Sequence, residues 1–138
     1  MKSLLQETKI IAVVGLSDKP SRPSYDVSRY MQAHGYQIIP VNPSCTEILG
    51  EKCYPDLKSI PVPVDMVNVF RKSEDCLPVA KEAVAIGAKS LWLQLGVIND
   101  EAHDFAQAHG LIVVMDKCLK IEHMINSRYS PSQQKNSF

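Results

Sequence analysis

The sequence has 138 residues, 45% of them hydrophobic, which is the size and composition of a single domain with its own apolar core. Fifteen basic side chains balance fifteen acidic ones, and this zero net charge argues against binding to nucleic acid or anionic membranes through a basic surface. No apolar run is long enough to span a membrane, and the first residues lack the longer apolar region of a signal peptide. We therefore expect a cytoplasmic protein without nucleic-acid or membrane partners.

Five short apolar runs, rich in valine and isoleucine, predict five strands. Most of them lack the alternation of apolar and polar residues that marks a strand with one wet face, so burial on both faces is expected. The predicted strands are Ile10–Gly15, Gln37–Asn42, Asp65–Phe70, Leu91–Gly96 and Leu111–Asp116.

Helical patterns separate most of these strands, and three of them end at a glycine. Gly35, Gly87 and Gly110 stand where a helix terminus favours a left-handed residue, and a strand follows each within a few positions. Asn99 is suited to cap the third of these helices. A last helix is expected over Leu119–Asn126. The link from 43 to 64 is different, because its prolines and turn residues leave room for one helical turn near 56–60.

Strands that alternate with helices favour right-handed crossovers and a parallel sheet covered on both faces. We therefore predict a Rossmann-like α/β fold, a three-layer α/β/α domain over residues 1–126 with a five-stranded parallel sheet. In order of appearance along the chain, the expected strand order is 3-2-1-4-5. Residues 127–138 are polar and poor in apolar side chains, and we expect them to form a disordered tail.

Ligands of such sheets bind beyond the carboxyl ends of the strands, so the residues after each predicted strand are the first candidates. The loop after the first strand predicts a phosphate site, since it combines a glycine, hydroxyls, two cations and a helix N-terminus. Its candidate residues are Gly15, Ser17, Lys19, Arg22 and Ser24.

The other strand ends make a dinucleotide less favoured. The loop lacks the G-x-G-x-x-G pattern, and the second strand ends in Val41, Asn42 and Pro43 without the carboxylate that a ribose of NAD requires. The third strand is followed by two cations, which are either phosphate ligands or simply solvated. The fourth is followed by an amide and a glycine that a ligand could approach. These further candidates are Arg71, Lys72, Gln94 and Gly96.

Residues suited to catalysis are few. No nucleophile motif or metal-binding spacing is present, and the two histidines at helix ends, His34 and His109, are expected to cap carbonyl groups. His123 has no evident partner in the sequence. Four scattered cysteines indicate separate thiols in a reducing compartment. Cys118 is the one placed for a lowered pKa, between a strand end and a helix start, although an inert role is favoured.

Five motifs in order resemble the stand-alone CoA-binding domain family, the YccU-like proteins. They are G-L-S-x-x-P-x-R-x-S, G-Y-x-I-x-P-V-N-P, D-x-V-x-V-F-R-x-S-E, L-W-L-Q-x-G and G-x-x-V-V-x-D-x-C, spread over about residues 8–126. The chain is also similar to the nucleotide-binding domain of the succinyl-CoA synthetase alpha subunit. That enzyme needs a further domain with a phosphorylated histidine, so we expect no ligase activity from these residues alone.

The resemblance implies a Rossmann-like fold that binds coenzyme A. It implies that Gly15 to Ser24 hold the diphosphate and that Val41, Asn42 and Pro43 flank the adenosine. Arg71 and Ser73 would lie on the nucleotide side, and Gln94 and Gly96 on the side of the pantetheine arm.

The prediction for function is therefore a small non-catalytic module that binds CoA or an acyl-CoA, with an unidentified protein partner. Two alternatives stay open: an enzyme that depends on CoA or on Cys118, and a protein that binds NAD(P), with Arg71 and Lys72 at the extra phosphate.

Overall fold

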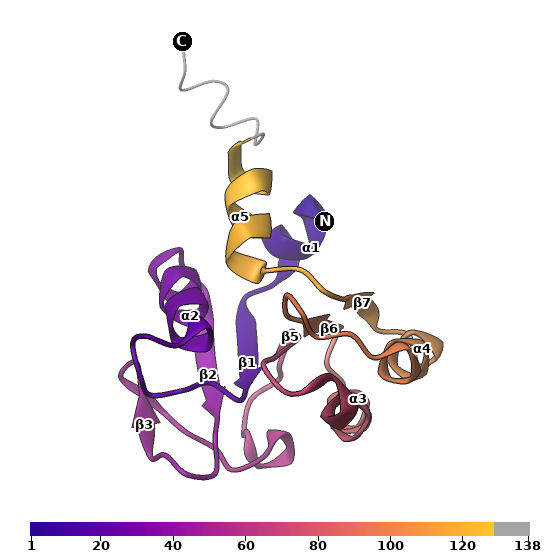
Figure 1. Cartoon of the computed structure of the whole chain (residues 1–138), viewed down its shortest axis with the longest axis horizontal. Coiled ribbons are helices and arrows are strands. Elements are labelled where there is room, and N and C mark those ends of the chain that lie inside the picture. The colour runs from indigo at the N-terminus through magenta and orange to yellow at the C-terminus, as the bar shows by residue number, and fades with distance from the viewer. Residues whose placement is uncertain (129–138) are drawn as a thin grey trace.

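The computed structural model describes residues 1–128 and shows three α/β/α layers around one five-stranded parallel sheet (Figure 1). Each strand falls on one of the five predicted apolar runs, and the predicted fold class is confirmed. The strands are β1 (Ile10–Val14), β2 (Gln37–Val41), β5 (Met66–Val69), β6 (Ser90–Leu93) and β7 (Ile112–Val114).

The predicted order of the strands was wrong. The sheet runs β2-β1-β5-β6-β7, so the third predicted strand pairs directly with the first and not with the second. The chain therefore reverses its direction of winding between β1 and β5, which is the place where a doubly wound sheet binds its ligands.

Asp65 supplies a physical reason for this order at the amino edge of the sheet. Its Oδ2 accepts the N–H groups of Lys9 and Ile10 at 3.0 and 2.9 Å, which ties the start of β5 to the start of β1. The carbonyl oxygen of Asp65 accepts the N–H of Ser90 at 3.0 Å, so the same residue also holds β6. Burial raises the pKa of Asp65, but the two N–H donors and Lys89 outweigh it, and the pKa lies below its ordinary value.

Helices cover both faces of the sheet. One face carries α1 (Lys2–Glu7), α2 (Pro23–Ala33) and α5 (Leu119–Arg128), whose apolar side chains surround the buried Trp92. The other face carries α3 (Cys76–Ala85) and α4 (Asp100–Ala108), and its core is rich in alanine and valine. Each helix thus buries one side against a sheet that is itself apolar on both faces.

Several local predictions hold. Asn99 caps α4, because its Oδ1 accepts the N–H of Ala102 at 2.8 Å. The predicted turn of helix near residue 57 is a 3-10 turn, η1 (Leu57–Ser59), capped by Asp56. His34 and His109 each place Nδ1 2.8 Å from a helical carbonyl oxygen. Within residues 1–128, no helix has the length and apolarity needed to cross a membrane.

The structure also has elements that the sequence did not predict. The first is α1, and the second is a small hairpin of β3 (Glu47–Ile48) and β4 (Glu51–Lys52) inside the link after β2. A second 3-10 turn, η2 (Ser73–Asp75), precedes α3. The last helix continues to residue 128, two residues beyond its expected end, so the predicted tail does not begin at 127. The remaining tail residues lie outside the described part of the chain.

Candidate functional site

The loop between β1 and α2 begins at Gly15, which lies at the carboxyl end of β1. Gly15 has φ +85°, a left-handed conformation that side chains other than hydrogen rarely adopt. A Cβ at this position would also collide with the carbonyl oxygen of Phe70, at the end of β5. The N–H of Gly15 donates to the carbonyl oxygen of Val41 at 3.1 Å. The glycine therefore lets the loop leave the sheet between its two neighbouring strands.

Two serine hydroxyls fix the shape of this loop. The N–H of Ser17 donates to the Oγ of Ser24 at 3.0 Å, and the N–H of Lys19 donates to the Oγ of Ser17 at 3.1 Å. Asn42 holds the loop from the second strand, because its Nδ2 donates to the carbonyl oxygen of Leu16 at 2.9 Å. Ser24 is buried, whereas Lys19 and Arg22 are exposed. The hydroxyls thus serve the loop itself, and the cations face solvent.

Helix α2 starts immediately after this loop. Pro23 occupies its first turn and Arg22 is the capping position, but no side-chain oxygen caps the helix. Pro23 has no N–H, and those of Tyr25 and Asp26 donate to the carbonyl oxygen of Arg22 at 3.1 and 3.2 Å. The N–H of Ser24 and the positive end of the helix dipole are therefore what this helix start offers to an anion.

A cleft of about 300 Å³ lies over the loop. Two cations and no carboxylate line it, which suits a phosphate group. Its walls are formed by Gly15, Ser17, Lys19, Arg22, Pro23, Ser24 and Phe70. All five loop residues predicted from the sequence therefore meet in one cleft. Pro23 and Phe70 also line the cleft and were not among the predicted site residues.

A larger cleft of about 600 Å³ lies on the other side of Phe70 and Pro23, which line both clefts. Arg71 and Gln94 line this larger cleft, so Arg71 shares a cleft with the residue expected at the pantetheine arm. The remaining lining residues are Asp26, Val27, Lys72, Leu95, Val97, Cys118, Lys120 and Ile121.

Helix α5 forms one wall of the larger cleft and is held in place by two polar contacts. Lys120 places Nζ 2.9 Å from Oδ2 of Asp26 on α2, and this hydrogen bond is the main reason why the pKa of Asp26 is lowered. The buried Gln94 accepts the first N–H of α5, that of Leu119, through Oε1 at 3.4 Å. The Oε1 of Gln94 is therefore occupied by α5, and its amide nitrogen, Nε2, is the atom that can donate a hydrogen bond into the cleft.

Five of the predicted site residues line neither cleft. Val41 is buried in the core, Asn42 braces the loop, and Pro43 is exposed beside it. Ser73 accepts the N–H of Ile98 through Oγ at 3.0 Å, and Gly96 donates its N–H to Asp116 at 2.7 Å. These residues shape the loops around the clefts, and their contacts with a ligand stay predictions.

The four cysteines are free thiols. Burial raises the pKa of Cys76, the first residue of α3, and of Cys53, which follows the β3–β4 hairpin. Cys118 is half-buried and, of the four, it is the one that lines the larger cleft.

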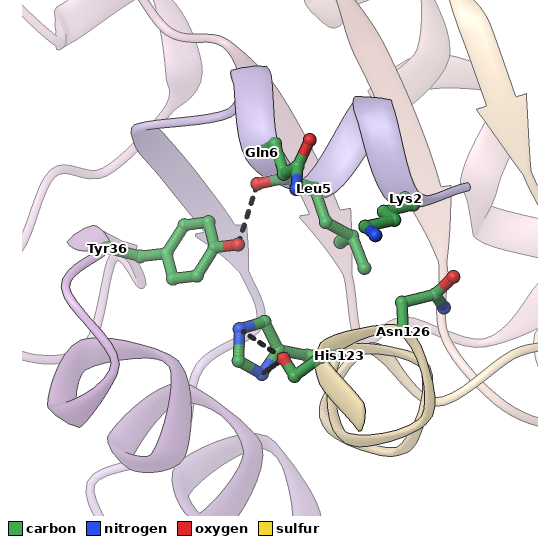
Figure 2. Close-up of a pocket in the computed structure, with 7 residues that line it drawn as sticks. Lys2, Leu5, Gln6, Tyr36, His123 and Asn126 are labelled. Atoms are coloured by element: carbon green, nitrogen blue, oxygen red, sulfur yellow. Dashed lines mark hydrogen bonds between the residues drawn. The ribbon is translucent and has the colours of Figure 1, made fainter. Parts of the chain in front are cut away.

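A third, smaller pocket lies between α1 and α5 and contains His123 (Figure 2). The Nδ1 of His123 lies 2.8 Å from the hydroxyl of Tyr30, so this histidine has a partner that the sequence did not reveal. Figure 2 shows the Tyr36 hydroxyl directed at the main chain of α1, where it donates to Leu5 at 2.7 Å. Burial, followed by the proximity of His34, lowers the pKa of His123. These contacts join α1, α2 and α5 and give the pocket a structural role.

A family model for the CoA binding domain matches residues 9–124. The chain belongs to the CoA-binding domain family. This match confirms the resemblance found in the motifs, and it covers β1 to α5, including both clefts.

Relatives of two kinds support the same assignment. The uncharacterized protein YneT of Bacillus subtilis is 48% identical over 125 residues, which are 91% of this chain and 93% of that protein. A hypothetical protein from Pyrococcus horikoshii has a solved structure with 38% identity and a TM-score of 0.89, covering 91% of this chain and 89% of the other.

A second kind of relative is much longer. An ADP-forming acetate–CoA ligase of Archaeoglobus fulgidus is 29% identical over 101 residues, which are 72% of this chain but only 15% of the ligase. This chain is therefore homologous to the CoA-binding portion of such ligases, and it spans a small part of their length.

Proposed function

We propose that this protein binds coenzyme A or an acyl-CoA across its two clefts and acts as a small non-catalytic nucleotide-binding module. The observation that carries the proposal is the position of the loop cleft at the winding reversal between β1 and β5, in a chain of the CoA-binding family. The two cations of this cleft and the uncapped N-terminus of α2 suit a diphosphate. The diphosphate is the charged group that CoA has in common with other nucleotides.

The two clefts suggest how the rest of the ligand lies. The pantetheine arm passes Phe70 and Pro23 into the larger cleft, where the amide nitrogen of Gln94 can donate to an amide oxygen of the arm. The adenosine lies on the opposite side of the loop, against Asn42 and Pro43. Arg71 shares the larger cleft with Gln94, and this placement favours a role beside the diphosphate over a role at the 3′-phosphate.

A dinucleotide is the less favoured ligand. At the end of β2, where a nicotinamide cofactor requires a carboxylate for its ribose, the side chain is that of Asn42. Both ends of this side chain are already used, because Nδ2 donates to Leu16 and Oδ1 accepts the N–H of Ser44 at 2.8 Å.

The positions of the four histidines support a non-catalytic role. Two of the four cap helical carbonyls, His103 pairs with its neighbour Asp104, and His123 belongs to the separate pocket between α1 and α5. The groups that line the two clefts can bind and orient CoA, and the one carboxylate among the lining residues, that of Asp26, is held by Lys120 at 2.9 Å with its pKa lowered, which makes it a weaker base.

Isothermal titration of the purified protein tests the proposal, with CoA, dephospho-CoA, ADP, NAD and NADP as ligands. We expect CoA to bind most tightly and NAD and NADP to bind no better than ADP. Tighter binding of NADP than of CoA would contradict the proposal. A parallel incubation with CoA, acetate and ATP should form no acetyl-CoA, and its formation at a rate that scales with the protein would refute the non-catalytic role.

A further inference from the structure

We propose that the larger cleft holds the acyl group of an acyl-CoA and that it selects an uncharged hydrocarbon chain over an acyl group ending in a carboxylate. This inference rests on the proposed function, since it takes the diphosphate to lie over the loop. It adds the chemical class of the acyl group and the residues that recognise it.

The first observation is the chemistry of the cleft wall. Its apolar side chains come from four different elements of the fold: Val27 from α2, Phe70 after β5, Leu95 and Val97 after β6, and Ile121 from α5. A volume of about 600 Å³ lies within the range of small-molecule sites, which are mostly apolar with a few polar groups that orient the ligand. The wall of the cleft therefore suits a hydrocarbon group better than a charged group.

The second observation is the exposure of two of these side chains. Leu95 is 62% exposed and Ile121 is 47% exposed, although both are large and apolar. They line the same cleft from two sides, so a hydrocarbon chain lying between them would be covered by both. Removing that apolar surface from water is the main source of the expected gain in affinity.

Of the four charged side chains that line the cleft, two are paired with each other. Lys120 is paired with Asp26 at 2.9 Å, which leaves the exposed Arg71 and Lys72 as the cations without such a pair in the cleft lining. These two directly follow Phe70, the residue shared with the phosphate cleft, so their main chain lies next to the junction of the two clefts and we assign them to that end of the larger cleft. A carboxylate at the far end of an acyl group would meet the apolar wall instead, and its desolvation would weaken binding.

The continuity of the two clefts fixes the direction of the ligand. Because Pro23 and Phe70 line both, a ligand anchored by its diphosphate at the loop can extend past them without leaving the protein surface. The thioester end then reaches the part of the cleft formed by Leu95 and Ile121.

The chain offers a matched pair of residues for the test. Ile121 and Ile125 lie one turn apart on α5 and are 47% and 46% exposed, but Ile121 lines the larger cleft and Ile125 does not. Replacing either by serine removes the same apolar group from the same helix, so any difference between the two variants reports on the cleft.

The experiment measures the affinity of CoA, acetyl-CoA, butanoyl-CoA, hexanoyl-CoA and succinyl-CoA by calorimetry. For the unmodified protein we expect affinity to rise from acetyl- to hexanoyl-CoA, by up to about fourfold per buried methylene. Succinyl-CoA should bind no better than acetyl-CoA. In Ile121→Ser the ratio of hexanoyl- to acetyl-CoA affinity should fall at least several-fold, whereas Ile125→Ser should keep the original ratio.

The outcomes separate this inference from the proposed function. Failure of CoA itself to bind would refute the proposed function. Tight binding of CoA with equal affinity for all chain lengths, or a preference for succinyl-CoA, would overturn only the assignment of the acyl group. An equal loss in Ile121→Ser and Ile125→Ser would also overturn it, because the cleft would then have no special part in the selection.

Discussion

The sheet has an amino edge, where its parallel strands begin, and a carboxyl edge, where they end, and the polar groups at these two edges have different partners. At the amino edge, the carboxylate of Asp65 accepts two main-chain N–H groups, and its own carbonyl oxygen accepts another. At the carboxyl edge, the loop after Gly15 ends in a helix start without a side-chain cap, with Lys19 and Arg22 exposed beside it. One edge satisfies its polar groups internally and supports stability. The other leaves exposed cations and an uncapped helix start, and this is why we propose it as the CoA site.

Gly15→Val gives the largest expected effect, because an added Cβ at Gly15 has no space beside the carbonyl oxygen of Phe70. Valine would be held in the left-handed conformation that Gly15 adopts, and its Cβ would collide with the carbonyl oxygen of Phe70, which together should lower the free energy of unfolding by about 2–5 kcal/mol. Chemical denaturation measures this loss, and CoA binding should fall below detection. Gly35→Ala is the control, since Gly35 also has positive φ but its Cβ would meet open space. An equal loss in both variants would show that the contact with Phe70 is unimportant.

Asp65→Ala tests the amino edge. Loss of its charge-assisted hydrogen bonds should lower the free energy of unfolding by about 2–3 kcal/mol, with CoA affinity unchanged in the folded protein. Because the pKa of Asp65 is lowered on folding, its contribution is present above the ordinary carboxyl pKa and lost as pH falls through the folded value. The variant should therefore lose less stability on acidification than the parent protein.

Asp104 provides the control for that experiment. Its side chain is 77% exposed, so Asp104→Ala should change the free energy of unfolding by less than about 0.5 kcal/mol. If Asp65→Ala behaved in the same way, the stabilising role of the amino edge would be refuted.

Arg22→Ala should affect binding without affecting the fold. Loss of a charge-assisted hydrogen bond to the diphosphate predicts a ten- to hundredfold weaker affinity for CoA and for dephospho-CoA alike. Arg29→Ala is the matched control, because Arg29 is an exposed arginine on α2 that pairs with Asp26 and lines neither cleft. Unchanged CoA affinity in Arg22→Ala, measured by calorimetry, would remove the loop from the site.

Arg71→Ala should give the smallest effect. Arg71 is exposed, and such a charge contributes about 0–1 kcal/mol, or at most about a fivefold change in affinity. Because Arg71 lies in the larger cleft with Gln94, we expect the same small loss for CoA and dephospho-CoA. A loss confined to CoA would place Arg71 at the 3′-phosphate instead.

Local sequence patterns were sufficient to predict the strands and most helices. Valine-rich runs and glycines at helix ends act within a few residues, so they can be read without the fold. The strand order could not be read in this way, because it depends on contacts such as that of Asp65 with Ile10, more than fifty positions apart. The six-residue α1 was missed because it buries only Leu5 and carries little periodicity.

The candidate site, too, has residues that a local sequence pattern predicts and residues that only the folded structure brings together. The loop residues from Gly15 to Ser24 were found because they follow one another after a strand, where position alone favours binding. Phe70, Leu95 and Ile121 were missed because they become neighbours only when three elements pack around the larger cleft.

The most direct test of the account is an amide chemical-shift titration of isotope-labelled protein with CoA. We predict that the amides of Gly15, Ser17, Lys19 and Ser24 shift with increasing CoA, while those of Lys9 and Ile10, held by Asp65 at the opposite edge, keep their positions. Shifts centred on the amino edge, with the loop amides unmoved, would contradict the assignment of the carboxyl edge as the CoA site.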